Sequence, residues 1–425
     1  MNSREKFIEI MNFNTNINVP KWEYAYWGAT INRWYNEGLP ENNYPVLPTN
    51  IVTTSSSLYT AAWTHEWRKK QTIFEKIFKE REEKILLKDG VAVWAEALYW
   101  PTQGLPLDKD VNKYFGFDKA VILVNVEQLF YPRFEIKILD EDDKFLIYID
   151  IDGVTRKYSK QESTIPTSID WPVKDWESWL KIKKDRLNFD NIGQRFPNNW
   201  NELLKDYKNR DYVLAIGGFP IGFFGILAHI LGYANLFYFY YDQPDLLKDI
   251  LETFTQLWIA IWSEVFSQVD VDVVHIWEDV SAGKGSMISK EIFQTFMTPY
   301  YKKLTGFLKS AGIKNILVDT DGNCNELIPL FMEAGVTGLY PMEASAGMDV
   351  IAVRKKYPEL QIMGGIPKLD ISLGKKRIVE ILEPIKFLIQ KGGYIPFCDH
   401  SVPPSISWNN FKYYREQLNQ IIDDA

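Results

Sequence analysis

The amino-acid sequence predicts an α/β protein of the (β/α)₈ TIM-barrel class, with a single domain over residues 1–425. Short apolar runs alternate with helical segments through the second half of the chain, which is the pattern of repeated strand–helix units. With two further runs upstream, the predicted strands reach the eight that close a barrel. A doubly wound sheet would instead carry a glycine-rich phosphate-binding turn after its first strand, and the sequence has none there.

The predicted elements follow one another in a regular order. Each predicted strand is a short apolar run between turn residues, and these runs are Trp22–Trp27, Val121–Val126, Tyr212–Ile216, Val271–Trp277, Asn315–Asp319, Gly338–Pro341, Gln361–Gly365 and Gly393–Phe397. Helices are predicted in the second half over Pro244–Phe266, Lys290–Ala311, Asn325–Ala334, Asp349–Lys356 and Lys375–Gln390. Ser289 is placed to cap a helix N-terminus, and Gly335 and Gly392 are placed to end helices in the left-handed conformation.

Two segments interrupt this alternation. Residues Phe134–Tyr158 alternate apolar and polar side chains around Asp152 and Gly153, which predicts a β-hairpin or meander that decorates the barrel. Residues 41–108 are predicted to be an insertion that contains a charged helix over Arg68–Leu87. The sequence shows no internal repeat and no low-complexity linker, so we expect one elaborated domain.

The composition of the chain argues against some classes of partner and indicates a cellular compartment. The net charge is −8, the isoelectric point is about 5.3 and no basic stripe is present, so nucleic acid is not an expected partner. The two cysteines, Cys324 and Cys398, cannot form a disulfide framework, which fits a reducing compartment and a cytoplasmic location. The uncharged stretch Tyr212–Tyr241 is broken repeatedly by glycine and proline, so no membrane span is expected there.

The predicted strand ends are mostly acidic. Loops after the strand C-termini form the active site of a (β/α)₈ barrel, and five carboxylates fall in these loops: Glu278, Asp279, Asp319, Asp321 and Glu343. Like charges at short range need compensation, which a bound metal, protonated carboxyl groups acting as general acids, or a cationic substrate would each provide. Lys368 and His400 are the titratable partners of opposite charge at the strand ends. Asp319, Asp321 and His400 form a two-carboxylate, one-histidine set that suits Zn²⁺, Mn²⁺ or Fe²⁺.

Structural roles compete with these interpretations. Asp321 is equally well placed to cap the helix that follows it. His275 lies within an apolar run and is expected to be a core histidine or one that supports a site residue from behind. His65 and His229 are expected to be structural. Cys398 is expected to be an inert buried thiol. The glycine-rich loop 217–222 suits close backbone packing as well as it suits phosphate binding.

Several segments form a recognisable set, namely Trp27–Thr30, Trp34–Pro40, Tyr114–Asp118, Trp277–Gly283, Asp319–Asn323, Gly338–Met348, Gly364–Lys368, Gly392–Ile395 and Asp399–Pro404. Together they resemble the uroporphyrinogen decarboxylase superfamily, which also contains corrinoid- and coenzyme-M-linked methyltransferases. The resemblance covers nearly the whole chain outside residues 41–108. It implies a (β/α)₈ barrel and an enzymatic role, and it is not specific for one reaction.

Comparison with the decarboxylase branch shows departures. Decarboxylases of the superfamily carry an arginine-rich motif after the first strand that grips substrate carboxylates, whereas the matching stretch Tyr26–Arg33 holds only Arg33. Asn125 and Glu127 stand near the position of the decarboxylase aspartate that follows the second strand. His400 matches the eighth-strand histidine. The match to the motifs of the decarboxylase branch is therefore partial.

The methyltransferase branch binds Zn²⁺ through a His-x-Cys pair after the fifth strand and a cysteine after the eighth. These positions match Asp319, Asp321 and His400 here, so the spacing is retained and the soft sulfur ligands are replaced. Oxygen and nitrogen ligands still suit a divalent ion, although a harder one. The resemblance therefore implies a related metal-assisted reaction.

We expect a superfamily enzyme, a transferase or a lyase, that catalyses metal-assisted methyl transfer involving a corrinoid or a small-molecule substrate. Asp319, Asp321 and His400 are the expected metal or acid–base centre, with Glu278 and Glu343 as secondary acids. The expected substrate-binding residues are Trp27, Arg33, Phe219, Asn125, Glu127 and Lys368. Two alternatives are cofactor-free decarboxylation of a tetrapyrrole precursor and a non-catalytic barrel that binds a corrinoid protein. The candidate partners are a small molecule, a corrinoid protein and a second copy of the chain.

Overall fold

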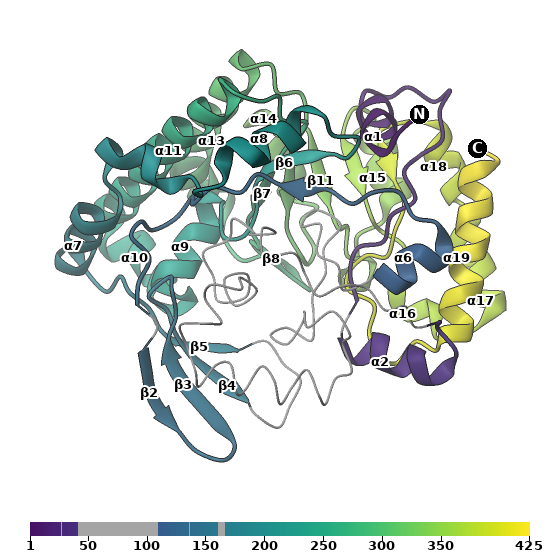
Figure 1. Cartoon of the computed structure of the whole chain (residues 1–425), viewed down its shortest axis with the longest axis horizontal. Coiled ribbons are helices and arrows are strands. Elements are labelled where there is room, and N and C mark those ends of the chain that lie inside the picture. Colours follow the sequence, from purple (N-terminus) through teal and green to yellow (C-terminus); the bar gives the residue numbers. More distant parts are fainter. Residues whose placement is uncertain (27, 41–108, 136, 160–165) are drawn as a thin grey trace.

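The computed structural model describes residues 1–26, 28–40, 109–135, 137–159 and 166–425 (Figure 1). Trp27 and the predicted insertion 41–108 lie outside the described residues. The two termini lie on the same side of the molecule, next to helices from the C-terminal part of the chain (Figure 1).

A parallel sheet of seven strands forms the centre of the fold, and its spatial order is the order of the chain. From one edge to the other its strands are β1 (Ile122–Leu123), β6 (Leu214–Gly217), β7 (Val273–Trp277), β10 (Ile316–Asp319), β11 (Gly338–Tyr340), β12 (Gln361–Met363) and β13 (Tyr394–Ile395). Helices connect successive strands, and such a sequential order is typical of TIM-barrel-like sheets. All seven strands coincide with predicted runs, although several are shorter.

The predicted first strand, Trp22–Trp27, forms only an isolated parallel bridge between Tyr26 and Val402. Its segment nevertheless lies between the two edges of the sheet. On the β13 side, the amide of Val402 donates to the carbonyl of Ala25 at 2.8 Å. On the β1 side, the indole of Trp22 donates to the carbonyl of Lys119 at 3.0 Å. The described residues thus form a curled, seven-stranded TIM-barrel-like sheet, and they do not form the complete eight-stranded ladder that was predicted.

The helices surround this sheet (Figure 1). They are α1 (Ser3–Met11), α2 (Gly28–Glu37), α6 (Lys109–Phe115), α7 (Trp176–Arg186), α8 (Trp200–Lys208), α9 (Phe223–Leu231), α10 (Tyr233–Asp242), α11 (Pro244–Phe266), α12 (Lys290–Ile292), α13 (Thr298–Ser310), α14 (Ile328–Glu333), α15 (Val350–Lys356), α16 (Lys368–Ile371), α17 (Lys375–Leu382), α18 (Ile385–Gln390) and α19 (Trp408–Asp423). The predicted helix Pro244–Phe266 has the observed bounds. The predicted helix Lys375–Gln390 is two helices, because Pro384 lacks the amide that would continue the first one.

The predicted helix caps are confirmed. The hydroxyl of Ser289 accepts the amide of Ile292 at 3.2 Å. Gly335 and Gly392 follow helix ends with φ of 96° and 71°, the left-handed region that glycine enters without steric cost. At Gly392 a side chain would also collide with the backbone of Phe13 at 2.8 Å.

The predicted meander is confirmed and extends by one strand. It is an antiparallel sheet of β2 (Lys137–Glu141), β3 (Phe145–Ile149), β4 (Thr155–Ser159) and β5 (Thr167–Asp170). The buried guanidinium of Arg156 pairs with Asp150 at 2.5 Å and with Asp152 at 2.7 Å. Asp152 in turn lies 2.9 Å from His229 of α9, so a buried polar contact fixes the meander to the helices around the central sheet. His229 is therefore structural, as predicted.

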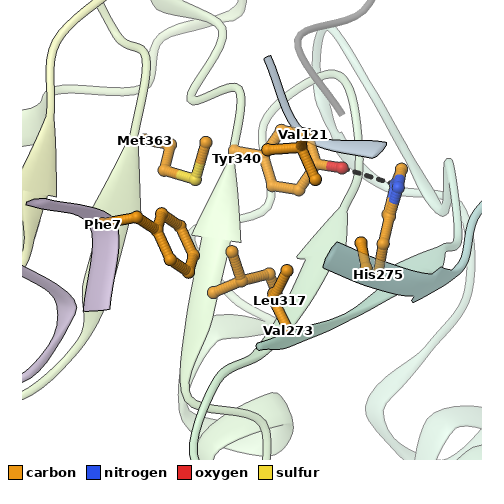
Figure 2. Close-up of a pocket in the computed structure, with 8 residues that line it drawn as sticks. Phe7, Val121, Val273, His275, Leu317, Tyr340 and Met363 are labelled. Atoms are coloured by element: carbon orange, nitrogen blue, oxygen red, sulfur yellow. Dashed lines mark hydrogen bonds between the residues drawn. The ribbon is translucent and has the colours of Figure 1, made fainter. Parts of the chain in front are cut away.

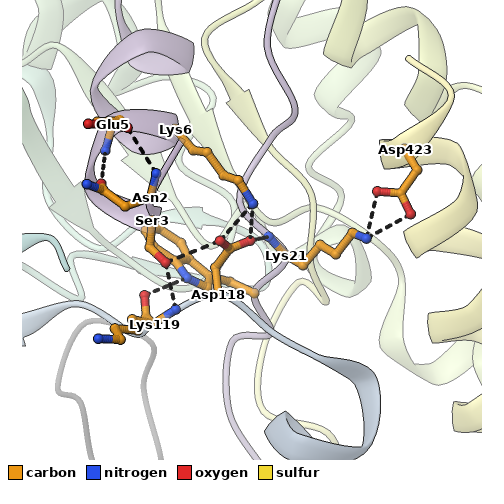
Figure 3. A network of polar contacts seen from close by, with 9 residues as sticks. Asn2, Ser3, Glu5, Lys6, Lys21, Asp118, Lys119 and Asp423 are labelled. Atoms are coloured by element: carbon orange, nitrogen blue, oxygen red, sulfur yellow. Dashed lines mark hydrogen bonds and ion pairs between the residues drawn. The ribbon is translucent and has the colours of Figure 1, made fainter. Parts of the chain in front are cut away.

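The N-terminal helix α1 covers the end of the sheet where the strands begin. Asp118, just before β1, accepts from the ammonium of Lys6 at 2.8 Å and from the hydroxyl of Ser3 at 3.2 Å (Figure 3). Phe7 points into the sheet interior, where it lines a small apolar cavity with residues of β7, β10 and β12 (Figure 2). Because α1 occupies this end, a ligand site is expected at the opposite end, where the strands finish.

Among the described residues no single helix has the length and apolar composition needed to cross a membrane. Helices α9 and α10 pass that test only as a pair, and they are bent by 109° with respect to each other. Most side chains of α9 are buried within the fold.

A buried ion pair connects the first predicted strand to the last helix. The carboxylate of Glu23 lies 3.3 Å from the guanidinium of Arg415 in α19, and both side chains are fully buried. The same carboxylate accepts the hydroxyl of Tyr414 at 3.1 Å and the amide of Cys398 at 2.7 Å. Glu23 therefore holds together three segments that the sheet ladder does not join.

We predict that Glu23→Ala lowers the free energy of unfolding by about 3–5 kcal/mol, because it leaves the charge of Arg415 buried and unpaired. Urea denaturation followed by circular dichroism measures this change. The matched control is Glu252→Ala, which breaks a half-exposed ion pair with Lys303 and is expected to cost less than about 1 kcal/mol. Equal losses in the two variants would contradict the role assigned to Glu23.

Candidate active site

The ends of β7 and β10 bring the acidic residues together. Glu278 and Asp279 follow β7 directly, and the amide of Glu278 donates to the carbonyl of Asp319, the last residue of β10, at 2.9 Å. The carboxylates of Asp279, Asp319 and Asp321 influence one another electrostatically, and His400 pairs with one of them. We call Asp279, Asp319, Asp321 and His400 the acidic cluster. The sequence predicted that five carboxylates converge here, and the structure brings three of them, Asp279, Asp319 and Asp321, into this cluster.

Asp321 and His400 form an ion pair at the open side of the cluster. Nε2 of His400 lies 3.1 Å from Oδ2 of Asp321, and the two side chains are 21% and 33% exposed. Burial lowers the pKa of His400, but the hydrogen bond and the negative charge of Asp321 outweigh it, so the pKa of His400 is raised overall. Oδ1 of Asp321 is buried and has no hydrogen-bond partner among the described residues. The described contact of Asp321 is thus with His400 and not with the amides of a following helix.

Asp319 lies at the inner side of the cluster. It is 3% exposed, and its Oδ2 lies 3.3 Å from Nε2 of His275. Burial, followed by the charges of Asp321 and Asp279, raises the pKa of Asp319 well above its usual value. Burial alone lowers the pKa of His275 to about 3. In this pair the proton therefore stays on the carboxyl group, and the imidazole stays neutral.

Asp279 has an unusual backbone as well as an unusual environment. Its φ is 51°, in the left-handed region that is uncommon for residues other than glycine, asparagine and aspartate. Burial, followed by the charge of Asp321, raises the pKa of Asp279 to about 7, although the amide of Asp321 hydrogen-bonds to it. Such a carboxyl group can both give and take a proton near neutral pH.

Glu278 points away from the cluster and caps a helix. Its two carboxylate oxygens accept the amides of Phe223, Phe224 and Gly225 at 2.7–2.9 Å, at the N-terminus of α9. The hydroxyl of Tyr301 donates to the same group at 2.5 Å. Burial raises the pKa of Glu278 to about 7 against the lowering effect of these hydrogen bonds. The predicted role of Glu278 as a secondary acid gains no support from these contacts, which are those of a helix cap.

A second group of charges lies beside the cluster. The ammonium of Lys368 lies 3.5 Å from Asp399 and 3.6 Å from Glu343, and its side chain is 11% exposed. Both distances are long for hydrogen bonds, so the ammonium keeps donors available for another acceptor. Burial raises the pKa of Asp399, while the Lys368 charge lowers it. The sequence predicted Glu343 and Lys368 as site residues but did not single out Asp399.

Two tyrosines complete the site and were missed from the sequence. Burial, then the charges of Asp319 and Asp321, raise the pKa of Tyr24 well above its usual value, and its ring lies 5.2 Å from that of His400. Tyr340, the last residue of β11, hydrogen-bonds to Nε2 of His275. The position of Tyr340 at a predicted strand end was the available signal. Aromatic residues are so frequent in this chain that the signal did not stand out.

Other predicted substrate-binding residues make contacts away from the acidic cluster. Arg33 pairs with Glu37 at 2.6 Å and donates to the carbonyl of Pro404. Glu127 pairs with Arg133. Asn125 is buried after β1, and its side-chain amide nitrogen has no partner in the part of the chain that the structure describes. Phe219 packs its ring against Trp277 at 4.5 Å. Trp27 is outside the described residues.

The geometry of the cluster bears on the predicted metal ligands Asp319, Asp321 and His400. No group of three histidine, cysteine, aspartate or glutamate side chains within the described ranges is arranged to hold a metal ion. Asp319 faces His275, while Asp321 faces His400, so the three predicted ligands are divided between two pairs. The donor set of Asp319, Asp321 and His400, as folded, does not fit the metal centre predicted from the sequence.

Both cysteines are buried structural thiols. Burial raises the pKa of Cys324 to about 12 and that of Cys398 well above its usual value. A thiol in this state is a poor nucleophile and a poor metal ligand. The prediction that Cys398 is buried is confirmed.

A parallel sheet whose strand ends gather buried carboxyl groups, a histidine and a lysine defines a TIM-barrel-like enzyme site. The sequence of residues 201–420 matches the family model described as uroporphyrinogen decarboxylase (URO-D). Since the match spans more than half of the chain, the protein belongs to the uroporphyrinogen decarboxylase family. No match is found among curated protein sequences.

Two solved structures are similar to parts of the fold. One is a Listeria monocytogenes protein with the provisional name vitamin-B12-independent methionine synthase, at 11% identity and a TM-score of 0.31, covering 52% of this chain and 69% of that one. The other is 3-keto-L-gulonate-6-phosphate decarboxylase from Vibrio cholerae, at 14% identity and a TM-score of 0.20, covering 50% of this chain and 85% of that one. Both similarities are too weak to bear on the reaction.

We predict that Asp279→Asn stabilises the protein more at pH 8 than at pH 5. The folded-state pKa of Asp279, about 7, lies above the ordinary value of 3.8, so the unfolded chain loses its proton first and stability falls as the pH rises between these values. Asparagine removes this loss and tolerates the left-handed backbone, so its stabilising effect is expected to be about 1–3 kcal/mol larger at pH 8. Thermal and urea unfolding at both pH values measure the difference. The exposed Asp245→Asn variant is the control, and a gain that does not grow with pH would contradict the raised pKa.

Proposed function

We propose that this protein is an enzyme that acts on a small molecule by proton transfer from the acidic cluster. The observation that supports the proposal is the buried carboxyl group of Asp319 at the end of β10, whose pKa is raised well above its usual value by burial and then by the charges of Asp321 and Asp279. The adjacent Asp321–His400 pair holds a second exchangeable proton. A protonated carboxyl group and a neighbouring ion pair are the elements of general acid–base catalysis.

Methyl transfer and decarboxylation both need a proton donor. Removal of a methyl group from oxygen or nitrogen leaves an atom with an extra electron pair, and that atom takes up a proton. Decarboxylation leaves the electron pair on carbon, and the carbon takes up a proton. In both cases a buried acid beside the reacting atom lowers the barrier by neutralising this charge. We assign this task to Asp319, with Asp279 and the Asp321–His400 pair restoring its proton.

Methyl transfer is the leading reaction in this proposal because of the charges around the cluster. The described cations beside it, Lys368 and His400, are both paired with carboxylates, and Arg33 is held by Glu37. A substrate with many carboxylates would meet net negative charge, whereas a neutral or cationic methyl donor would not. The ammonium of Lys368, which lies 3.5–3.6 Å from its carboxylate partners, is placed to hydrogen-bond one oxygen of such a substrate.

Two cofactors bear on this reaction, a metal ion and a corrinoid. Since the three predicted metal ligands form two separate pairs, no step is assigned to a metal ion. A corrinoid carried by a partner protein would supply the acceptor for the methyl group when bound. The residues of this chain would then bind the donor, hold it against Asp319 and protonate the atom that loses the methyl group.

Decarboxylation of a tetrapyrrole precursor is the second candidate. It is favoured by His400, which matches the histidine of the decarboxylase branch, and it needs only the acid–base groups described above. A non-catalytic barrel that binds a corrinoid protein is the third. Its sequence support, the segment 41–108, lies outside the described residues.

The assay that tests the proposal uses reduced free cobalamin as methyl acceptor and a panel of O-methyl and N-methyl compounds as donors. We predict methyl transfer, followed by the absorbance of cobalamin, and losses of about 100-fold or more in Asp319→Asn and His400→Gln. Glu252→Gln, which changes a distant surface carboxylate, is expected to keep full activity. Turnover of uroporphyrinogen with no methyl transfer would favour the second candidate, and inactivity with both substrate classes would favour a binding role.

Metal content is a separate prediction. Because the predicted ligands are divided between two pairs, we expect protein purified without chelator to contain well below about one equivalent of Zn, Mn or Fe. Elemental mass spectrometry of the untagged protein measures this content. About one equivalent, lost in an Asp319→Ala/His400→Ala double variant, would contradict the expectation and restore the metal centre predicted from the sequence.

A further inference from the structure

We infer that Glu278 and Tyr301 are positioning residues that hold Asp279 at the strand ends in its left-handed backbone conformation. The inference rests on the proposed function, because Asp279 is one of the groups to which proton transfer is assigned. Glu278, which the sequence predicted as a secondary acid, then acts through the residue that follows it. Tyr301, in α13, was not predicted as a site residue.

The side chain of Glu278 is held by the start of α9. It is fully buried, and its two oxygens accept the amides of three consecutive residues at 2.7–2.9 Å, namely Phe223, Phe224 and Gly225. The hydroxyl of Tyr301, which is also fully buried, donates to the same carboxylate at 2.5 Å. We call Glu278 with these four donors the Glu278 clamp. Hydrogen bonds to a carboxylate are strong when water is excluded, so this side chain has a single orientation.

Two glycines allow the end of β7 and the start of α9 to approach each other closely. A Cβ atom on Gly222 would lie 1.9 Å from the carbonyl oxygen of Trp277 and 3.0 Å from Cδ of Glu278. A Cβ atom on Gly225 would lie 2.2 Å from the same carbonyl oxygen. No other residue fits at these distances, so the missing side chains are what bring the amides of α9 to Glu278. The clamp therefore depends on closely packed backbone.

The backbone after β7 is held from the opposite side by the end of β10. The amides of Glu278 and Asp279 both donate to the carbonyl of Asp319, at 2.9 Å and 3.4 Å. The next amide, that of Val280, donates to the hydroxyl of Thr320 at 3.1 Å. Between these contacts Asp279 has a φ of 51°. A residue in this region is strained, and it stays there only where its surroundings over-determine its conformation.

The clamp keeps Asp279 next to a group that repels it. In the left-handed conformation the carboxyl group of Asp279 accepts the backbone amide of Asp321, although the charges of the two side chains oppose each other. Repulsion and backbone strain would together favour a turn of Asp279 away from Asp321. Since Glu278 is fixed on both sides, the residue that follows it cannot make this turn. Glu278 and Tyr301 thus maintain the arrangement of acids without contacting a substrate.

Urea denaturation of variants at position 279 tests the clamp without a substrate. Asp279→Gly and Asp279→Ala both remove the carboxyl group, but glycine alone enters the left-handed region without steric cost. With Glu278 in place, we expect Asp279→Gly to have the higher urea midpoint. In a Glu278→Gln background, where an amide group replaces one acceptor oxygen, we expect the order to reverse. Alanine is favoured over glycine once the residue adopts an ordinary backbone conformation, because it restricts the unfolded chain.

A milder variant and a matched control complete this test. Tyr301→Phe removes one hydroxyl of the clamp, and it is expected to reduce the difference between Asp279→Gly and Asp279→Ala even if Glu278→Gln does not fold. Asp349→Ala removes the side-chain cap of α15, and it is expected to lower both midpoints and keep their order. The same order and the same difference in every background would overturn the inference. So would a lack of advantage for glycine when Glu278 is present.

The methyl-transfer assay distinguishes positioning from general stability. We expect Glu278→Gln and Tyr301→Phe to lower kcat by about 10-fold or more with KM nearly unchanged, because the clamp places an acid and does not bind the substrate. A raised KM with unchanged kcat would overturn the positioning role. The urea midpoints require no turnover, so inactivity of the unsubstituted protein would contradict the proposed function and leave the order of the midpoints standing.

Discussion

Three carboxyl groups that lie close together at the ends of adjacent parallel strands cannot all carry a charge without compensation. This constraint organises the site of the protein. Burial and mutual repulsion raise the pKa values of Asp319 and Asp279, whereas Asp321 is compensated by His400. The cluster therefore places two carboxyl groups with raised pKa values next to an aspartate–histidine ion pair. Such a difference between adjacent titratable groups is what acid–base catalysis needs.

The surroundings of the cluster are arranged to maintain this state. Glu278 follows the same strand as Asp279 but satisfies the N-terminal amides of α9, so it holds the loop in place instead of adding a further charge to the cluster. Glu23 and Arg415 hold the segment with Tyr24 beside the segment with His400. Helix α1 covers the opposite end of the sheet, so ligand access is directed to the strand ends.

Membership of the uroporphyrinogen decarboxylase family fits this arrangement and leaves the reaction open. The family position of the site at the strand ends is retained. In the sequence comparison, Asp321 and His400 stand at the positions of the sulfur ligands of one branch. The arginine-rich stretch of the other branch holds only Arg33, which is engaged by Glu37. Acid–base chemistry is the function that needs only the residues present. This is why proton transfer is placed at the centre of the proposal, with methyl transfer as its leading form.

The sequence by itself determined the class of fold and the acidic character of the site. These features are encoded by local signals. Apolar runs located seven strands and the residues that follow them, and the run that begins at Pro244 located the long helix α11. The tertiary structure decided the rest, because pairing between residues far apart in the chain leaves no local pattern. Glu278, predicted as a secondary acid, contacts the N-terminal amides of α9, and Asp319, predicted to share a ligand with His400, contacts His275. Asp319 and Asp321 follow β10 and His400 follows β13, and the direction of each side chain depends on packing from neighbouring strands, which only the folded chain specifies.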